Sequence, residues 1–443
     1  MYHVSNKTID IVILSMLYPP DFGGMSSRAY SIAKSLSQRY TVHVISSEPR
    51  YPSGKINHSQ RSKECENNRI SVTRLPIPPI PYKGFLNRLI LFTWYSILAF
   101  FALIRLKNVK AVISAYPHPA IDFVSSLAKA LRSFKLVVDL SDLWPEAVTL
   151  PNRFLNYLFQ AIGYSINVAL FKGSPDAASV YNERALMIFQ RQYGFSKPAA
   201  VVYNSADIEK FNCRPHAENC RPALKSLLQR DIEDKFVILY SGTIGVYQNV
   251  GNIVYAAQKI RSMGKNEVVF VIVGEGEEKD KVVSLAKKLS LNNVVFLPKL
   301  RRDFLQNIIH EADLALVPIA YPNSIALYVG MPIKWAEYMA CRIPVLVPAN
   351  SFIGDLTTKY GSGFEVDFSD PGLVAKAIID AMSDKARLRF MGRNARQLAV
   401  DMLSEEKAMS NLNNLIQTLI DGRNHYVLNS IKSSGIRRIR SCL

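Results

Sequence analysis

The sequence is poor in cysteine, with five among 443 residues, and those five are scattered along the chain. A small odd set without regular spacing does not fit a disulfide framework, so we expect reduced thiols, which favours the cytoplasm. The first ten residues lack the apolar stretch of a signal peptide. No histidine pair has metal-ligand spacing, and Cys213, His216 and Cys220 lie together without a fourth ligand. No metal site and no cofactor are therefore expected.

The sequence also lacks the patterns of common nucleic-acid-binding folds, because no zinc-finger, homeodomain or RNP-type motif occurs. Its formal net charge is nevertheless +18. Such an excess indicates a polyanionic neighbour, and without nucleic acid the remaining classes are an anionic membrane surface and phosphorylated substrates. A nucleic-acid partner is not predicted.

An apolar run of full membrane-spanning length is missing, although residues 89–104 are nearly all apolar and have basic flanks. A spanning helix needs about 20 residues, and a crossing here would separate strands that share one sheet. Two alternatives remain for a helix over 85–106: a buried core helix, or an interfacial helix among lipid headgroups. The basic flanks, Trp94 and Tyr95 favour the interface, and the basic tail 423–443 fits an anionic bilayer. We expect a peripheral position on the inner face of the cell membrane.

Apolar strands alternate with helical stretches almost throughout, which predicts parallel sheets built from βαβ units. The pattern begins at the strand-like segment 9–16 and restarts at 235, after the polar linker 212–222. The predicted fold class is α/β, with two doubly wound Rossmann-like domains facing across a cleft. The predicted divisions are an acceptor-binding domain over 1–205, a nucleotide-sugar-binding domain over 206–402, a helix over 403–422 that crosses back to the first domain, and the tail 423–443.

Glycine-bearing loops follow strands in both halves, at the end of the sheet where ligands of such folds bind. Glycine lets backbone N–H groups approach phosphate oxygens, and the next helix adds its N-terminal dipole. Each loop alone also fits an ordinary tight turn, but several in register from two domains favour a nucleotide site. The loops carry Gly23 and Gly24 in the first half, and Gly242, Gly245, Gly274 and Gly276 in the second.

The stretch GMPIKWAEYMACRIPVLV, residues 330–347, combines a helix start with a buried strand. Pro332 suits the first position of a helix over 332–340, and residues 344–348 read as a parallel strand. Three-residue spacing puts Lys334 and Glu337 on neighbouring faces of that helix. One interpretation is a surface ion pair. The other is a phosphate at the helix N-terminus beside Lys334, with Glu337 accepting hydrogen bonds from ribose hydroxyls.

Taken in order, these segments resemble retaining glycosyltransferases of the GT-B fold in the large group 1 family, over nearly the whole chain. The pair SDLWPE and PIKWAEYMA resembles a subgroup that builds lipid-linked surface glycans. The other motifs are the loop with Gly23 and Gly24 before a helix that carries Arg28, the hinge from Asn204 to Phe211, SGTIG, VGEGEEK, EADLALVP and PIKWAEYMACRIPV.

The resemblance implies that the second domain binds a nucleotide-sugar, with uridine as the commonest nucleoside. Glu337 matches the glutamate that grips the donor ribose, and Lys334 would neutralise the leaving diphosphate. Val329 stands where many relatives carry a further glutamate. Arg342 stands at the usual glycine position after the helix, where a strained or differently shaped cap is expected. The implied donor-binding residues are Gly23, Gly24, Gly242, Thr243, Gly245, Gly274, Gly276, Gly330, Met331, Pro332, Ile333 and Glu337.

The expected reaction is a metal-independent transfer, because no Asp-x-Asp occurs in the chain, and the family implies retention of configuration. Catalysis is assigned to Lys334 and Asp142, although Asp142 also suits a helix cap. The acceptor is expected to be polyprenyl-linked or another glycan, bound to the first domain. Acceptor-side candidates are Arg28, His118, Glu146 and Arg184, of which His118 also fits a structural role. Two alternatives remain: a nucleotide-sugar epimerase of the same fold, and a non-catalytic membrane-surface scaffold, which the missing glutamate at Val329 supports.

Overall fold

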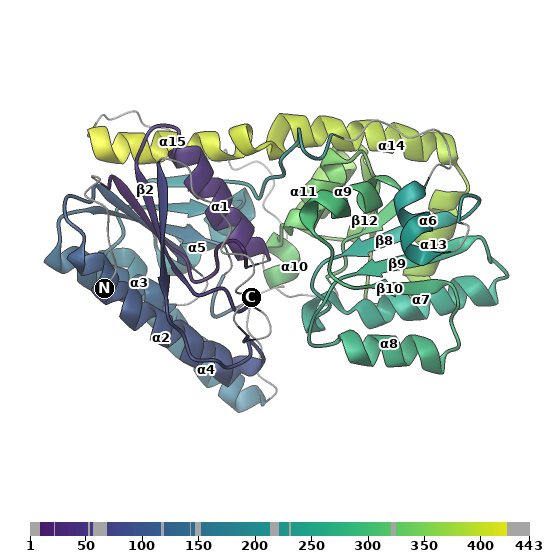
Figure 1. Cartoon of the computed structure of the whole chain (residues 1–443), viewed down its shortest axis with the longest axis horizontal. Helices are drawn as coiled ribbons and strands as arrows, with labels where there is room; N and C mark the ends of the chain where they lie inside the picture. The colour runs from purple at the N-terminus through teal and green to yellow at the C-terminus, as the bar shows by residue number, and fades with distance from the viewer. Residues whose placement is uncertain are drawn as a thin grey trace. The chain divides into compact units, whose positions relative to one another are not determined.

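The computed structural model describes residues 9–21, 23–51, 54–55, 69–116, 119–141, 143–146, 152–212, 221–229, 232–319 and 325–422. The chain forms two compact units: unit 1 holds Met1–Tyr203 and Glu406–Leu443, and unit 2 holds Asn204–Glu405. Each unit is built around one parallel sheet flanked by helices (Figure 1). The predicted class, an α/β protein with two doubly wound halves, is confirmed.

Unit 1 has a seven-stranded sheet with the order β3-β2-β1-β4-β5-β6-β7. Its central strand β1 is buried along its whole length and β5 is buried except for Lys135, as expected for a parallel sheet covered on both faces. The strand order reverses direction between β1 and β4, which makes their carboxyl ends the topological switch point. The strands are β1 (Ile11–Leu14), β2 (Val42–Ser47), β3 (Ile70–Leu75), β4 (Ala111–Tyr116), β5 (Lys135–Leu140), β6 (Ala177–Val180) and β7 (Ala199–Val201).

Helices cover both faces of this sheet. Helix α1 (Gly24–Leu36) and the last helix, α15 (Glu405–Asp421), share one apolar cluster, in which Leu412 and Ile416 join the α1 residue Ile32. Helices α2 (Gly84–Arg105) and α3 (Pro119–Leu131) contribute to a second cluster on the sheet. Helix α4 (Arg153–Gly173) packs beside α3, and α5 (Glu183–Tyr193) packs beside α4.

Unit 2 has a six-stranded sheet with the order β10-β9-β8-β11-β12-β13, so its switch point lies between β8 and β11. Its core is formed by buried side chains of the strands together with α7 and α13. The strands are β8 (Phe236–Ser241), β9 (Val268–Val273), β10 (Val294–Leu297), β11 (Leu314–Leu316), β12 (Val345–Pro348) and β13 (Gly363–Val366). The helices are α6 (Pro222–Leu228), α7 (Val250–Ser262), α8 (Lys279–Lys288), α9 (Arg302–His310), α10 (Ile325–Val329), α11 (Ile333–Ala340), α12 (Phe352–Tyr360), α13 (Pro371–Met382) and α14 (Lys385–Leu398).

Two helices of unit 1 are long and apolar enough to cross a membrane by length and composition, α2 and α4. The expected helix over 85–106 is α2, and its sides differ: Leu91, Phe92 and Tyr95 are buried, whereas Trp94 and Ile97 are exposed. One side of α2 thus belongs to the core and the other is exposed, and the interfacial position stays a prediction.

Some elements were not foreseen from the sequence. Helix α4 lies in a stretch for which no helix was predicted, and the edge strands β3 and β13 were not predicted either. Pro332 precedes its helix as the N-cap residue, with an extended backbone (φ −69°, ψ 139°), so α11 begins one residue later than predicted. Pro332 still fits there, because its missing N–H is no loss at a helix start.

Candidate functional site

Two glycine loops of unit 2 lie side by side because the strands before them are neighbours. Strands β8 and β9 pair in parallel, from Phe236 opposite Val268 to Ser241 opposite Val273. The loop with Gly242 and Gly245 follows β8, and the loop with Gly274 and Gly276 follows β9. Parallel strands bring both loops to the same edge of the sheet, next to the switch point.

The backbones of these two loops are fastened together. The N–H of Gly242 donates to the carbonyl of Val273 (2.9 Å), and the N–H of Ile244 donates to the carbonyl of Glu275 (2.9 Å). A Cβ at Gly274 would lie 1.9 Å from the Gly242 oxygen, and one at Gly276 would lie 2.2 Å from the Ile244 oxygen. Both glycines are thus required by backbone packing, a reason that the sequence analysis did not foresee.

This packing leaves fewer backbone donors for a ligand than the glycine content suggests. The N–H groups of Gly242, Ile244 and Gly274 each donate to a carbonyl of a neighbouring segment. Thr243 lies between two of them and is exposed. Gly245 precedes a short 3₁₀ turn, Val246–Gln248. Neutralisation of a bound phosphate would therefore depend mainly on a side-chain cation.

Helix α11 supplies such a cation. The Lys334 Nζ lies 4.0 Å from the centroid of the Tyr240 ring, and Tyr240 is in β8. Gly242 has φ +142°, and a Cβ there would lie 2.5 Å from the Lys334 Nζ, so a residue without a side chain is needed beside the ammonium group. One turn further along α11, the Tyr338 hydroxyl accepts a hydrogen bond from the N–H of Ser241 (2.8 Å). Lys334 in the first turn and Tyr338 in the second thus hold α11 against the carboxyl end of β8.

The surroundings of Lys334 make its charge adjustable. Burial lowers the pKa of the Lys334 ammonium group from 10.5 to about 7, and the nearby Glu337 carboxylate opposes this shift only in part. Glu337 itself is 6% exposed. A lysine with this pKa exists in both charged and neutral forms near neutral pH. An anionic ligand would shift it to the charged form.

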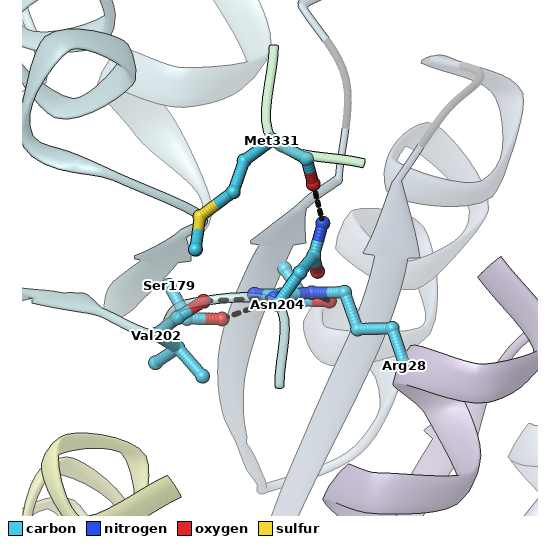
Figure 2. A network of polar contacts seen from close by, with 6 residues as sticks. Arg28, Ser179, Val202, Asn204 and Met331 are labelled. Atoms are coloured by element: carbon cyan, nitrogen blue, oxygen red, sulfur yellow. Dashed lines mark hydrogen bonds and ion pairs between the residues drawn. The ribbon is translucent and has the colours of Figure 1, made fainter. Parts of the chain in front are cut away.

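The segment before α11 is held by the first residues of unit 2. The Asn204 side chain donates to the carbonyl of Met331 (2.6 Å), as Figure 2 shows. A Cβ at Gly330 would lie 2.4 Å from the Ala326 oxygen, so this glycine is needed at the end of α10. Ile333, the first residue of α11, is half-buried. The Met331 side chain is buried and Pro332 is half-buried like Ile333, so the contact of these three residues with a donor stays a prediction.

Two departures from the family pattern have distinct structural outcomes. Val329, at the position where many relatives carry a glutamate, is 1% exposed and packs in the interior. Arg342 has φ +62°, so it adopts the left-handed conformation that favours glycine. The strained cap expected at Arg342 is confirmed.

In unit 1, Gly23 precedes α1 with φ +107°, and Gly24 begins the helix, so both lie at the carboxyl end of β1. Arg28 follows one turn later and is 4% exposed. Its guanidinium donates from Nε and Nη2 to the two Asp139 carboxylate oxygens (2.8 and 2.6 Å), and from Nη1 to the Val202 carbonyl (2.8 Å; Figure 2). Ser179 adds a hydrogen bond to Asp139. The structure gives Arg28 a buried ion pair, and sequence reasoning missed Asp139 because 111 positions separate the two residues.

The other candidates of unit 1 do not come together among the described residues. Glu146 lies after β5 and contacts the end of α5, where its Oε1 accepts hydrogen bonds from the Tyr193 hydroxyl (2.5 Å) and from the Gln192 amide. Arg184 is the second residue of α5. Asp142 and His118 lie outside the described residues, so their roles stay predictions.

Within the described ranges, no group of three or more His, Cys, Asp or Glu side chains is placed to hold a metal ion. Metal-independent transfer remains a prediction.

The comparisons with known proteins agree with this organisation. Residues 229–398, most of unit 2, match the family described as Glycosyl transferases group 1, which indicates a glycosyltransferase. WcaI of Escherichia coli (strain K12), named as a candidate colanic acid biosynthesis glycosyl transferase, is 24% identical over 321 residues, which are 69% of this chain and 76% of WcaI.

Solved structures show the same fold. Sucrose-phosphate synthase from Thermosynechococcus elongatus superposes with a TM-score of 0.75 at 17% identity, covering 94% of this chain and 100% of that one. HepE from Anabaena, in complex with UDP-glucose, superposes with a TM-score of 0.69 at 16% identity and the same coverage. The fold is therefore of the GT-B type, as predicted.

Proposed function

We propose that the protein is a retaining glycosyltransferase that moves a sugar from a nucleotide-sugar to a lipid-linked or glycan acceptor at a membrane surface. The observation that carries the proposal is the position of Lys334, which α11 holds against the glycine loop after β8, beside the switch point of unit 2. A similar fold in HepE holds UDP-glucose, which supports a uridine nucleotide as the donor.

The donor would lie at the carboxyl ends of β8 and β11. Its diphosphate would meet Lys334, because the N–H groups of Gly242 and Gly274 already donate within the protein. The Glu337 carboxylate, one turn along α11 and in a buried setting, would accept hydrogen bonds from the ribose hydroxyls. The sugar would face the backbone of Gly330–Ile333.

The chemical step needs a stabilised leaving group rather than a protein nucleophile. The acceptor hydroxyl attacks the anomeric carbon, the bond from that carbon to the diphosphate breaks, and the acceptor proton passes to the departing phosphate oxygen. Attack from the face of the leaving group retains the configuration. Lys334 stabilises the charge that builds on the diphosphate, at a site where burial strengthens the interaction. Asp142 remains the proposed residue for orienting the acceptor hydroxyl.

The proposed location is the inner surface of the cell membrane, with the exposed side of α2 in contact with lipid. Trp94, Ile97 and Phe101 are each about half exposed on that side, and Arg105 ends the helix. An acceptor carried on a polyprenyl lipid would then be available at the same surface.

Calorimetric titration with UDP, GDP, ADP and CMP tests the donor site. We expect one nucleotide, UDP, to bind, and Glu337→Gln to weaken it at least tenfold, or about 1.4 kcal/mol. The matched control is Glu267→Gln, which changes an exposed carboxylate just before β9, at the opposite end of the strand. Failure of every nucleotide to bind would favour the scaffold. Conversion of a bound UDP-sugar into an isomer without release of UDP would identify an epimerase.

A further inference from the structure

Among the described residues of unit 1, all large apolar side chains that are exposed lie on three helices. Of the 24 large apolar side chains that are exposed in the described part of the chain, 17 lie on α2, α3 and α4, and the other seven all lie in unit 2. The most exposed include Leu86 on α2, Leu131 on α3, and Phe154 and Tyr157 on α4, the last two at 73% each. We name the exposed apolar side of these three helices the αface.

The αface is one continuous surface. Helix α3 packs against both α2 and α4, and all three lie on the same side of unit 1 in Figure 1. The Phe85 ring of α2 touches the Phe159 ring of α4, with 5.4 Å between centroids. A core helix would be mostly buried, yet only 33% of the apolar window of α2 and 17% of that of α4 are buried. Side chains of this kind over three adjacent helices form a patch that calls for an apolar partner.

Charge identifies that partner as an anionic lipid surface. Helices α2 and α4 contain no acidic residue, and the Asp122 carboxyl of α3 is buried. Exposed cations stand at the helix ends. They include Arg105 at the end of α2, Lys107 just after it, and Arg153 and Lys172 at the two ends of α4. A second copy of this face would bring like charges together, whereas an anionic bilayer complements them.

The buried side of α2 argues against a crossing of the bilayer. The inner side of α2 holds Leu91, Phe92 and Tyr95 in the core, and the Tyr95 hydroxyl donates to the β2 carbonyl of Ile45 (2.6 Å). A crossing would pull these groups from the sheet. Trp94, whose indole N–H donates to the Pro76 carbonyl (3.2 Å), is of the side-chain type enriched at membrane interfaces.

We propose that the αface is a bilayer-docking surface in which α4, together with α2, inserts its exposed side among anionic headgroups. This proposal specifies which surface contacts the membrane, and it rests on the proposed function for the assumption that the acceptor is carried by a lipid. The Trp144 ring contacts Phe159 of α4 (5.3 Å between centroids), so the loop after β5 lies at the edge of the αface. A lipid-borne acceptor would reach unit 1 from that edge.

Co-sedimentation with phosphatidylcholine vesicles, with and without phosphatidylglycerol, tests the role of α4. In the test variant Phe154, Leu158 and Ile162, which share one side of α4, are replaced by serine. We expect the wild-type protein to bind vesicles that contain phosphatidylglycerol, and the variant to bind them at least about tenfold more weakly. Vesicles of phosphatidylcholine alone should bind the wild-type protein more weakly, because the cations lose their partners.

A matched control replaces three exposed apolar side chains of unit 2, Met263, Phe304 and Phe390, by serine. We expect wild-type vesicle binding from the control. Equal binding by the α4 variant and the control would overturn the proposal. So would self-association that the α4 substitutions abolish while vesicle binding stays unchanged, because the occupant would then be a second copy. Both variants should keep their UDP affinity and melting temperature, so a failed donor site and a failed docking surface are distinguished.

Discussion

Lys334 allows a direct test of the donor site through its protonation. With a pKa of about 7 in the free protein, Lys334 is charged in about a tenth of the molecules at pH 8, because each pH unit above the pKa lowers the charged fraction tenfold. If the diphosphate binds only the charged form, its binding must then be accompanied by the uptake of about 0.9 proton per site at Lys334. The UDP affinity should fall about eightfold from pH 7.5 to 8.5.

The assay is calorimetry in two buffers with different ionisation enthalpies, which measures the protons taken up on UDP binding. Lys334→Met keeps an unbranched apolar side chain but cannot be charged, so the proton uptake at pH 8 should disappear and the affinity should no longer depend on pH in this range. An unchanged proton uptake in the variant, or a wild-type affinity that is flat between these pH values, would refute the assignment of Lys334 to the diphosphate.

The same pKa fixes the sign of an effect on stability. Between pH 7 and 10.5 the unfolded chain binds more protons at Lys334 than the folded one, so this group makes the free energy of unfolding rise with pH across that window. Lys334→Met should therefore be more stable than the wild type below pH 7, and this advantage should vanish as the pH approaches 10.5. Thermal unfolding at several pH values checks the sign.

Two further predictions concern the frame of the two units. Gly274→Ala places a Cβ 1.9 Å from the Gly242 oxygen and should lower the free energy of unfolding by more than about 3 kcal/mol. The control Gly264→Ala has open space around its Cβ and only the cost of a positive φ (+76°), so it should lower that free energy by about 1 kcal/mol. Denaturant titration compares the two variants, and equal losses would contradict the loop packing. Burial lowers the pKa of His43 from 6.5 to about 4. The unfolded chain therefore binds more protons at His43 than the folded one between these pH values, and the free energy of unfolding should fall by about 3 kcal/mol as the pH falls from 6.5 to 4. His43→Gln should remove that part of the acid sensitivity, and an unaltered acid transition would show that His43 does not cause it.

Much of the fold was predictable because the sequence patterns that indicate its strands and helices are local. Buried parallel strands read as continuous apolar runs, and the segment with Lys334 and Glu337 combines a proline, a cation and a carboxylate within six positions. The structure indeed places Lys334 beside the loop after β8. The sequence alone could not show why residue 274 must be glycine, because a side chain there would collide with the backbone of Gly242, which is distant in sequence.

Two features needed information that no single segment carries. The Arg28 guanidinium pairs with Asp139 inside unit 1, and a lone arginine in the first turns of a helix gives no sign of such a partner. Helix α4 is apolar on most of its surface, which weakens the period of 3.6 residues that marks an amphipathic helix. Its cap was a usable signal, because the Asn152 side chain accepts a hydrogen bond from the N–H of Leu155 (3.0 Å).

The central claim is transfer of a sugar from a uridine nucleotide-sugar to a lipid-borne acceptor. The most direct measurement incubates the protein with radiolabelled UDP-sugars, polyprenyl-linked glycan acceptors and a metal chelator, and follows label into the organic phase together with released UDP. The account predicts one labelled lipid product, UDP release in equal amount, and loss of both in Lys334→Met. UDP-sugar that binds tightly but yields neither labelled lipid nor UDP would contradict it.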